Sequence, residues 1–166
     1  MLLLTLSLIV CSSTPSNATP LSDLQAWTLR LPSTAPSWKR QLATSHPKTV
    51  SVKLTAYSDD DALDPGTGGG SWGCTWTNPN NTHCPGLALR YGLVAAETRI
   101  WPTGTVFYAP PPFDRLWIVA DTGPAVRGRH IDVYCPTRET YQLTVAVPQP
   151  FTILHLGRIT HDQARR

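Results

Sequence analysis

The sequence predicts an all-β protein with six short strands, one short helix and an irregular segment before the first strand. Two observations support this. β-Branched and aromatic residues recur in short runs that are separated by glycine, proline and other turn-forming residues. In addition, the 166 residues include 16 prolines and 11 glycines, and only 15% are charged, which is typical of turn-rich exported proteins.

The first 18 residues are expected to be a signal peptide. Leu2 to Val10 is an apolar run of the length found in signal peptides and is too short to span a bilayer. Ser16-Asn17-Ala18 offers a cleavage site with small residues. No basic residue precedes the apolar run, which is atypical. We therefore expect a secreted, periplasmic or cell-envelope protein with no membrane span after removal of this segment.

Residues 19–49 are rich in serine, threonine and proline and lack a sustained hydrophobic period, which is typical of a linker. Leu21 to Leu29 has the pattern of a short amphipathic helix, and Pro32 and Pro36 prevent a long one. The two tryptophans of this segment are expected to lie against the following domain.

Residues 50–159 are expected to form one domain with a sizeable core, followed by a tail at 160–166. Its first strand alternates apolar and polar residues and is the clearest of the six. The expected strands are Val50 to Tyr57, Leu93 to Ala96, Thr105 to Ala109, Arg115 to Ala120, His130 to Val133 and Phe151 to Gly157. A short helix is expected from Thr137 to Leu143. These elements fit a barrel, and a sandwich with the same strands is the alternative.

Two acids stand at the edges of neighbouring expected strands. Asp121 directly follows the fourth strand, and Asp132 lies in the fifth. Gly123, Pro124 and Gly128 between them favour a tight return loop, which could bring the two carboxylates together. Carboxylates beside apolar strands are costly unless they are hydrogen-bonded or functional.

A purely structural role for both acids remains an alternative. Asp121 would then close a turn by accepting the backbone N–H groups of Thr122 and Gly123, and Asp132 would pair with a neighbouring arginine.

Three sequence blocks together resemble one known family. They are Thr55-Ala56-Tyr57, then Val94 to Thr105 (V-A-A-E-T-R-I-W-P-T-G-T), then Ala120 to Tyr134 (A-D-T-G-P-A-V-R-G-R-H-I-D-V-Y). In order and spacing they are similar to the 3D (Asp-Asp-Asp) domain, found in cell-wall proteins and in the barrel of membrane-bound lytic transglycosylase A. The resemblance covers about Val50 to Ile159 and implies a six-stranded double-psi β-barrel.

The resemblance also implies roles for three acids. Glu97 stands at the position of the family's first Asp, and Asp121 and Asp132 stand at the second and third. Asp132 would be the proton donor, Asp121 would orient it and stabilise positive charge, and Glu97 would be an outer acid. The chain departs from the pattern because the first acid is Glu and because Pro124 replaces the second glycine of D-T-G-G.

A second resemblance selects one more acid. Thr55 to Asp59 resembles the T-x-Y-x-D pattern of family-45 endoglucanases, and His130-Ile131-Asp132 resembles their H-F-D. These enzymes share the double-psi barrel, and their pattern implies that Asp59 is a general base and Asp132 a general acid.

Aromatic rings and backbone amides near these acids are the expected substrate-binding groups. Tyr57, Tyr134 and Trp76 would stack against sugar rings, and Thr122 and Gly123 would contact the substrate beside Asp121. Taken singly, each of these aromatic rings is more typical of the core than of a sugar-binding groove.

Three cysteines remain after the signal segment. A bridge between Cys74 and Cys84 would close a short loop around Trp76, which we expect to be a lid over the carboxylates; simple crosslinking of that loop is the alternative. Cys135 could also pair with either, and the sequence does not choose among the three pairings.

No cofactor and no metal site are expected. The aspartates from Asp59 to Asp64 lack the full calcium-loop pattern, and His83 beside Cys84 lacks the spacing of zinc ligands. The net charge of +3 is spread along the chain without a basic block, which argues against nucleic-acid binding.

Taken together, the sequence predicts a monomer that acts on peptidoglycan or another polysaccharide. The expected reaction is cleavage of β-1,4-glycosidic bonds by a lytic transglycosylase with carboxylate acid/base catalysis. Two alternatives stay open: an endoglucanase-type hydrolase that uses Asp59 and Asp132, and an expansin-like module that binds wall polysaccharide without catalysis.

Overall fold

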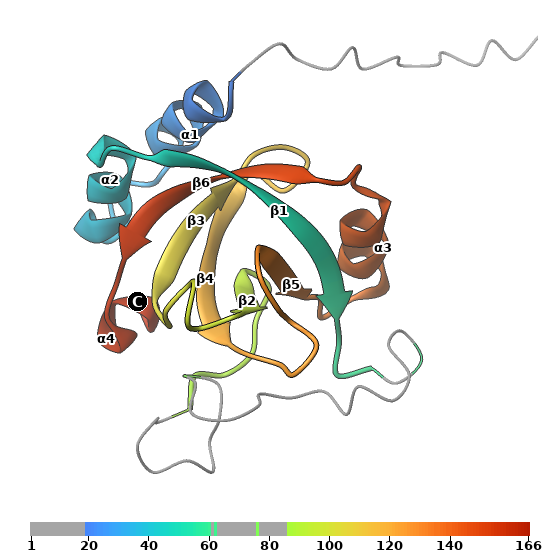
Figure 1. The fold of residues 1–166 in the computed structure, drawn as a ribbon. Coiled ribbons are helices and arrows are strands. Elements are labelled where there is room, and N and C mark those ends of the chain that lie inside the picture. The colour runs from blue at the N-terminus through green and yellow to red at the C-terminus, as the bar shows by residue number, and fades with distance from the viewer. Residues whose placement is uncertain (1–18, 61, 63–75, 77–85) are drawn as a thin grey trace, which may run out of the picture.

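The computed structural model describes residues 19–60, 62, 76 and 86–166. The expected signal peptide and Cys74 and Cys84 lie outside the described residues. Figure 1 shows a barrel with helices at its sides. In chain order the elements are α1 (Pro20–Leu29), α2 (Ser37–Thr44), β1 (Lys48–Tyr57), β2 (Leu93–Ala96), β3 (Thr105–Ala109), β4 (Arg115–Asp121), β5 (His130–Tyr134), α3 (Arg138–Ala146), β6 (Phe151–Arg158) and α4 (His161–Ala164).

The six strands form a closed barrel in the order β1-β5-β2-β4-β3-β6. The pairs β1–β5 and β2–β4 are parallel, and the other pairs are antiparallel. The predicted all-β barrel is therefore confirmed, and the sandwich alternative is excluded. β2 and β3 have the expected bounds, while β4 extends by one residue to include Asp121.

The barrel has a core built from alternate residues of its strands. On β1, Val50, Val52 and Leu54 belong to this core, with Trp117 of β4 among the largest fully buried side chains. Because side chains alternate between the two faces of a strand, Thr55 and Tyr57 lie on the opposite face of β1. That face carries the candidate site.

Residues 20–44, which have the composition of a linker, contain two helices that pack against the barrel (Figure 1). Thr19 caps α1, with proline in the first turn, where a missing N–H costs nothing. Leu24 is 0% exposed, and Trp38 of α2 is also buried in the same cluster. The tryptophans of this segment thus lie against the barrel as expected, with Trp27 6.0 Å from the ring of Tyr108.

On another side of the barrel, α3 packs against β1 (Figure 1). It begins at Arg138, one residue later than predicted, because Thr137 serves as its N-terminal cap and exchanges hydrogen bonds with Thr140. It ends at Ala146. Among the described residues, no helix has both the length and the apolar character needed to cross a membrane.

A candidate carboxylate site on the barrel wall

Four residues lie in one row across four adjacent strands. Thr55 of β1 is paired with Asp132 of β5, Asp132 with Ala95 of β2, and Ala95 with Asp121 of β4. Directly paired residues point to the same face of a sheet. The row therefore brings the two predicted acids to one surface, separated only by an alanine.

A β-bulge between β2 and β4 is responsible for the position of Asp121. Val94 is paired with Val119, but the next residue, Ala95, is paired with Asp121, so Ala120 is left over. Bulges of this kind redirect the side chains that follow them. Without the extra residue, Ala120 would stand beside Ala95 and Asp121 would fall out of the row.

The small side chain of Ala95 leaves room for Tyr57 to reach across the sheet. Neighbouring strands are about 4.8 Å apart, so the Cα atoms of Asp132 and Asp121 are separated by roughly 10 Å. Tyr57 belongs to a small cluster with Ala95 and Tyr134 and donates its hydroxyl to Asp121 Oδ2 at 3.0 Å. Its ring thereby bridges the row from β1 to β4.

Asp121 is a buried carboxylate held by hydrogen bonds. It is 1% exposed, and besides Tyr57 it accepts the backbone N–H of Thr122 at 2.8 Å. Burial, followed by the charge of Asp121 and the hydrogen bond to it, raises the pKa of Tyr57 well above its ordinary value. Tyr57 therefore remains a donor, and Asp121 is out of direct reach of a large substrate. Asp121 thus makes the expected turn-closing hydrogen bond with Thr122 in addition to its hydrogen bond with Tyr57.

Asp132 is only half-buried and belongs to a different hydrogen-bond chain. Thr55 donates its hydroxyl to Asp132 Oδ1 at 2.5 Å, and Thr55 Oγ1 also lies 2.7 Å from His130 Nε2. A hydroxyl has one proton, so when Thr55 donates to Asp132 it accepts from the imidazole. If Asp132 is protonated, both bonds can reverse. Thr55 thus couples the protonation states of Asp132 and His130.

The surroundings of His130 favour its neutral form. Burial and then the charge of Lys53 lower its pKa, while a hydrogen bond with the backbone of Ala125 opposes them. A neutral imidazole can accept a hydrogen bond from the Thr55 hydroxyl through its unprotonated nitrogen. The chain is then compatible with a protonated Asp132, the form that a general acid requires.

Asp59 lies at the same end of the sheet. It is exposed and accepts the hydroxyl of Tyr134 at 2.8 Å. Burial and then this hydrogen bond raise the pKa of Tyr134 to about 12. The Tyr134 ring packs edge-on against Tyr57 with centroids 5.4 Å apart, and the charges of Asp121, Asp132 and Asp59 all act on Tyr57. Asp121, Asp132 and Asp59 therefore surround one tyrosine.

Glu97 has a different position and anchors the loop between β4 and β5. Its Oε2 accepts the backbone N–H of Gly128 at 2.6 Å, and Gly128 has a φ of 69°, which favours glycine. Glu97 also lines a small cavity of about 190 Å³ with Arg99, Thr122 and Arg127. Its contacts support the shape of this loop.

Two other predicted binding residues differ in their surroundings. Gly123 is half-buried in the loop and accepts a hydrogen bond from Arg127 through its carbonyl oxygen. Trp76 packs against His161, with ring centroids 5.3 Å apart, and against Gly104. It belongs to the cluster around Trp38, whereas Tyr57 and Tyr134 form a separate cluster. The contacts described for Trp76 are those of a packed side chain.

Cys135 is a buried free thiol, so the two pairings that involve it are not formed. The remaining pairing, Cys74 with Cys84, and the lid proposed around it lie outside the described residues. Within the described part of the chain, no three His, Cys, Asp or Glu side chains form a group that could hold a metal ion.

Sequence inspection missed Thr55 and His130 as parts of the site. Each lies two residues before a selected residue on its own strand, Thr55 before Tyr57 and His130 before Asp132. The two-residue period of a strand places such neighbours on one face. That period was the available signal, but the pairing of β1 with β5 was needed to join the two residues.

The comparison with protein families agrees with this geometry. The family model of the 3D domain matches residues 93–145, from β2 into α3, and so includes Glu97, Asp121 and Asp132. Residues 93–145 are therefore similar to a 3D domain. This match and the closed six-stranded barrel are together consistent with a double-psi β-barrel protein of the 3D type, as the resemblance implied. A search of curated proteins found no significant match.

Proposed function

We propose that this 3D-domain protein is an exported lytic transglycosylase that cleaves β-1,4-glycosidic bonds of peptidoglycan. The observation that carries the proposal is the contrast between the two acids of the row. Asp132 is half-buried and hydrogen-bonded to Thr55, whereas Asp121 is 1% exposed beneath Tyr57. One carboxylate can meet a substrate, and the other supplies a fixed charge behind it.

In the proposed reaction, protonated Asp132 gives its proton to the glycosidic oxygen as the bond from that oxygen to the anomeric carbon breaks. The positive charge that develops on the sugar is stabilised by the negative charge of Asp121. The C6 hydroxyl of the muramic acid residue then attacks the anomeric carbon and returns a proton to Asp132. The product is a 1,6-anhydro end, and a single acid/base completes the cycle.

Thr55 and His130 have a positioning role in this scheme. The Thr55 hydroxyl fixes one oxygen of Asp132, and when Asp132 is protonated Thr55 accepts its hydrogen bond and donates its own to neutral His130. The two hydrogen bonds can therefore hold Asp132 in place in either protonation state.

A hydrolase is the second candidate, because Asp59 is an exposed carboxylate on the same tyrosine pair. An inverting hydrolase needs a base that activates water on the face opposite the acid, with the two carboxyl groups about 6.5–9.5 Å apart. In that scheme Asp59 deprotonates the water and Asp132 protonates the leaving oxygen.

Mass spectrometry of purified peptidoglycan after incubation with the protein separates these reactions. Anhydro ends support the transglycosylase, and reducing ends support the hydrolase. Unchanged glycan that still binds the protein would contradict both and support a binding module.

Asp59→Ala provides an independent kinetic test. A transglycosylase has no water to deprotonate, so its rate should change by less than about tenfold, whereas a hydrolase should lose on the order of 10²–10⁴. Asp162→Ala is the matched control, because its side chain is 89% exposed on α4 and lies outside the carboxylate row.

A further inference from the structure

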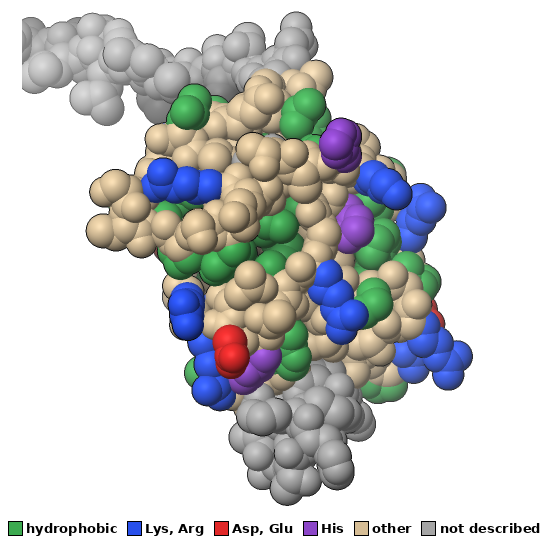
Figure 2. Space-filling model, turned by 90° about the vertical axis from the view of Figure 1, so that its left-hand side faces the viewer, with side chains coloured by type: hydrophobic (Ala, Val, Ile, Leu, Met, Phe, Trp, Pro, Cys, Tyr) green, Lys and Arg blue, Asp and Glu red, His purple; other side chains and the backbone are tan. Residues whose placement is uncertain are grey.

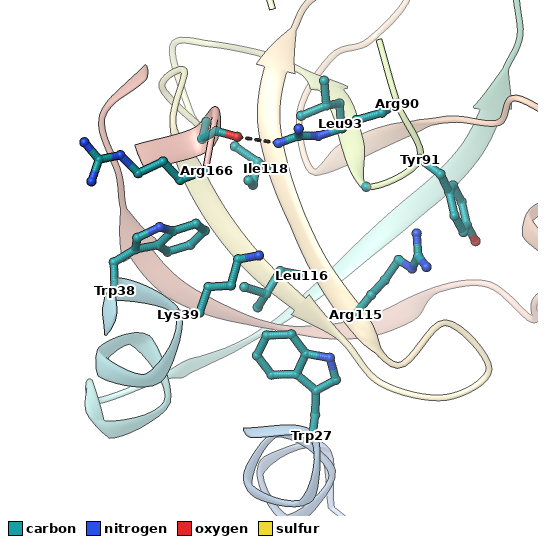
Figure 3. A pocket seen from close by; sticks show the side chains of 12 residues that line it. Trp27, Trp38, Lys39, Arg90, Tyr91, Leu93, Arg115, Leu116, Ile118 and Arg166 are labelled. Carbon is teal, nitrogen blue, oxygen red and sulfur yellow. Dashed lines mark hydrogen bonds between the residues drawn. The ribbon is translucent and has the colours of Figure 1, made fainter. Parts of the chain in front are cut away.

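A second cavity, of about 250 Å³, lies between the N-terminal helices and the barrel (Figure 3). Its walls come from α1, α2, the segment before β2, β4 and the end of the chain. It shares no lining residue with the carboxylate row, and no Asp or Glu lines it. Figure 2 shows one side of the molecule, on which basic side chains predominate over acidic ones.

The cavity is lined by four basic residues, Lys39, Arg90, Arg115 and the last residue of the given sequence, Arg166. Lys39 extends into the cavity from α2, and Arg90 and Arg115 approach from the barrel (Figure 3). Within the described part of the chain, no ion pair involves any of these three cations. Arg90 donates to the carbonyl oxygen of Ala164, and burial, followed by the charge of Arg90, lowers the pKa of Lys39. Uncompensated like charges are costly unless an anion joins them.

Three of the residues that line this cavity each carry a buried polar atom with no hydrogen-bond partner among the residues that the structure describes. These atoms are Nε1 of Trp38, Nε of Arg115 and the hydroxyl oxygen of Tyr91. Trp38 is 7% exposed, so its indole N–H is well removed from bulk water. Buried polar groups are normally satisfied. Indole and guanidinium N–H groups can only donate, so the missing partner must offer acceptors.

Aromatic rings complete the walls of the cavity. Trp27 presents its ring toward the cavity from α1 (Figure 3), and the Arg115 guanidinium lies 4.0 Å from the centre of the Tyr91 ring. Indole faces stack against sugar and other rings. Small-molecule sites usually measure about 300–1,000 Å³, so this smaller cavity suits one ring with one charged group.

We propose that this cavity binds a phosphate ester carried on a single sugar-sized ring. A phosphate offers more negative charge and more acceptor oxygens than a carboxylate, which matches a lining of four basic residues that also carries two N–H donors without a described partner. The ring lies against Trp27. The site is separate from the proposed glycan-cleaving site and does not depend on that activity.

Isothermal titration calorimetry of the full chain at low ionic strength tests this assignment with glucose 6-phosphate, inorganic phosphate, glucose and glucuronate. Glucose 6-phosphate is expected to bind most tightly, inorganic phosphate more weakly, and glucose not at all. Glucuronate carries a single negative charge and should bind about fivefold more weakly than the sugar phosphate. Equal binding of glucuronate would overturn the assignment of phosphate, and no binding of either phosphate would overturn the site.

Substitutions locate the binding. Lys39→Gln should weaken glucose 6-phosphate binding by about tenfold or more, and Lys39→Arg should largely retain it. Lys48→Gln is the matched control, because Lys48 is exposed and does not line the cavity. Equal affinities of Lys39→Gln and Lys48→Gln would show that the phosphate binds elsewhere.

Two further variants complete the test. Trp27→Leu should weaken binding of glucose 6-phosphate but not of inorganic phosphate, which keeps the proposal testable if Lys39→Gln does not fold. Asp132→Asn should retain glucose 6-phosphate affinity, so a failure of the proposed glycan cleavage is distinguishable from a failure of this site. Loss of phosphate binding in Asp132→Asn would contradict two separate sites.

Discussion

Asp132 and Asp121 are chemically identical side chains whose surroundings assign them different tasks. Asp121 is sealed by Tyr57 and held by the N–H of Thr122. Asp132 is half-buried and shares the Thr55 hydroxyl with His130. Environment, not residue type, separates acids and supporting charges in active sites. Tests at the scale of single residues should therefore give different results for the members of this row.

Asp132→Asn is expected to reduce glycan cleavage on the order of 10²–10⁴ while the protein stays folded. An amide keeps the size of the side chain and can still accept from Thr55, but it cannot give a proton to the substrate. Release of anhydro-sugar ends and the melting temperature are the two measurements. Unfolding of Asp132→Asn, with wild-type turnover in the remaining folded fraction, would instead make Asp132 a structural residue.

Thr55→Val is expected to shift the pH profile of kcat/KM, because it removes the hydroxyl that joins Asp132 to His130 while keeping the shape of the side chain. Thr55→Ser restores the hydroxyl and should restore the profile. A loss of activity by about tenfold is reasonable for a group that fixes a catalytic acid. If Thr55→Val lowers the rate without moving the profile, or if Thr55→Ser does not rescue it, the hydrogen-bond chain has no role in protonation.

At the scale of elements, glycines at two turns support the barrel for different reasons. Gly104 precedes β3 with a φ of 89°, donates to Val119 and accepts from the N–H of Ile159. A Cβ there would lie 2.3 Å from the carbonyl oxygen of Ile159. Gly128, in the loop between β4 and β5, has a φ of 69°, but a Cβ there would meet nothing within 4 Å. A side chain at position 104 would therefore meet both backbone strain and a clash, whereas a side chain at position 128 would meet backbone strain alone.

Gly104→Ala should therefore destabilise the protein by about 2–5 kcal/mol, and Gly128→Ala by about 1–2 kcal/mol. Gly128→Asn should cost less than Gly128→Ala, because asparagine tolerates positive φ. Urea unfolding measures all three values. Equal costs for the two alanine variants would mean that the contact of Gly104 with Ile159 relaxes freely.

At the scale of the whole molecule, the helices that precede the barrel are part of the folded unit. Leu24 of α1 is 0% exposed and shares a cluster with residues of β3, β4 and β6. Lys39 of α2 lies in the second cavity, which the same two helices cover. Removal of these helices would expose one side of the barrel, so the stability of the domain includes this segment.

Leu24→Ala is expected to lower the free energy of unfolding by about 2–5 kcal/mol, the usual cost of truncating a fully buried leucine. Leu21→Ala, in the same helix at a residue that is 42% exposed, is the control and should cost about 0.5 kcal/mol or less. Chemical denaturation of both variants measures the difference. Similar small costs would show that α1 is only loosely attached to the barrel.

The stability of the protein should fall as the pH drops below about 6.5, the ordinary pKa of histidine. Burial lowers the pKa values of His130 and His155 in the folded protein, so the unfolded chain binds more protons in the window between the two values. Stability therefore rises with pH through this window and is lost as pH falls. Melting temperatures measured between pH 7.5 and pH 5 check the trend.

His155→Phe should reduce that dependence on pH, because phenylalanine can pack against Trp101 and Phe107 without binding a proton. An unchanged slope of melting temperature against pH would assign the loss of stability in acid to other groups.

Much of the fold and part of the site could be predicted from local patterns. Apolar runs bounded by turn residues were sufficient to locate β2 and β3 to the residue, because strand formation follows alternation and turn chemistry. The loop between Asp121 and Asp132 was also visible, since glycine and proline mark a return. The helix expected at Leu21 to Leu29 is present as α1, but the linker-like composition of residues 19–49 did not indicate that Leu24 and Trp38 would be buried, because that burial depends on distant strands.

The rest depends on contacts between segments that are far apart in the chain. Only the pairing of β1 with β5 joins Thr55 to Asp132, and only the bulge between β2 and β4 turns Asp121 into the same row. Likewise, the basic cavity gathers Lys39, Arg90 and Arg115 from three separate segments that share no motif. Local sequence patterns determine which segments become strands and which acids stand at their edges, whereas register and packing determine which side chains meet. The physical reason is that pairing between strands is a non-local choice, and a shift of one residue reverses the face on which every later side chain lies.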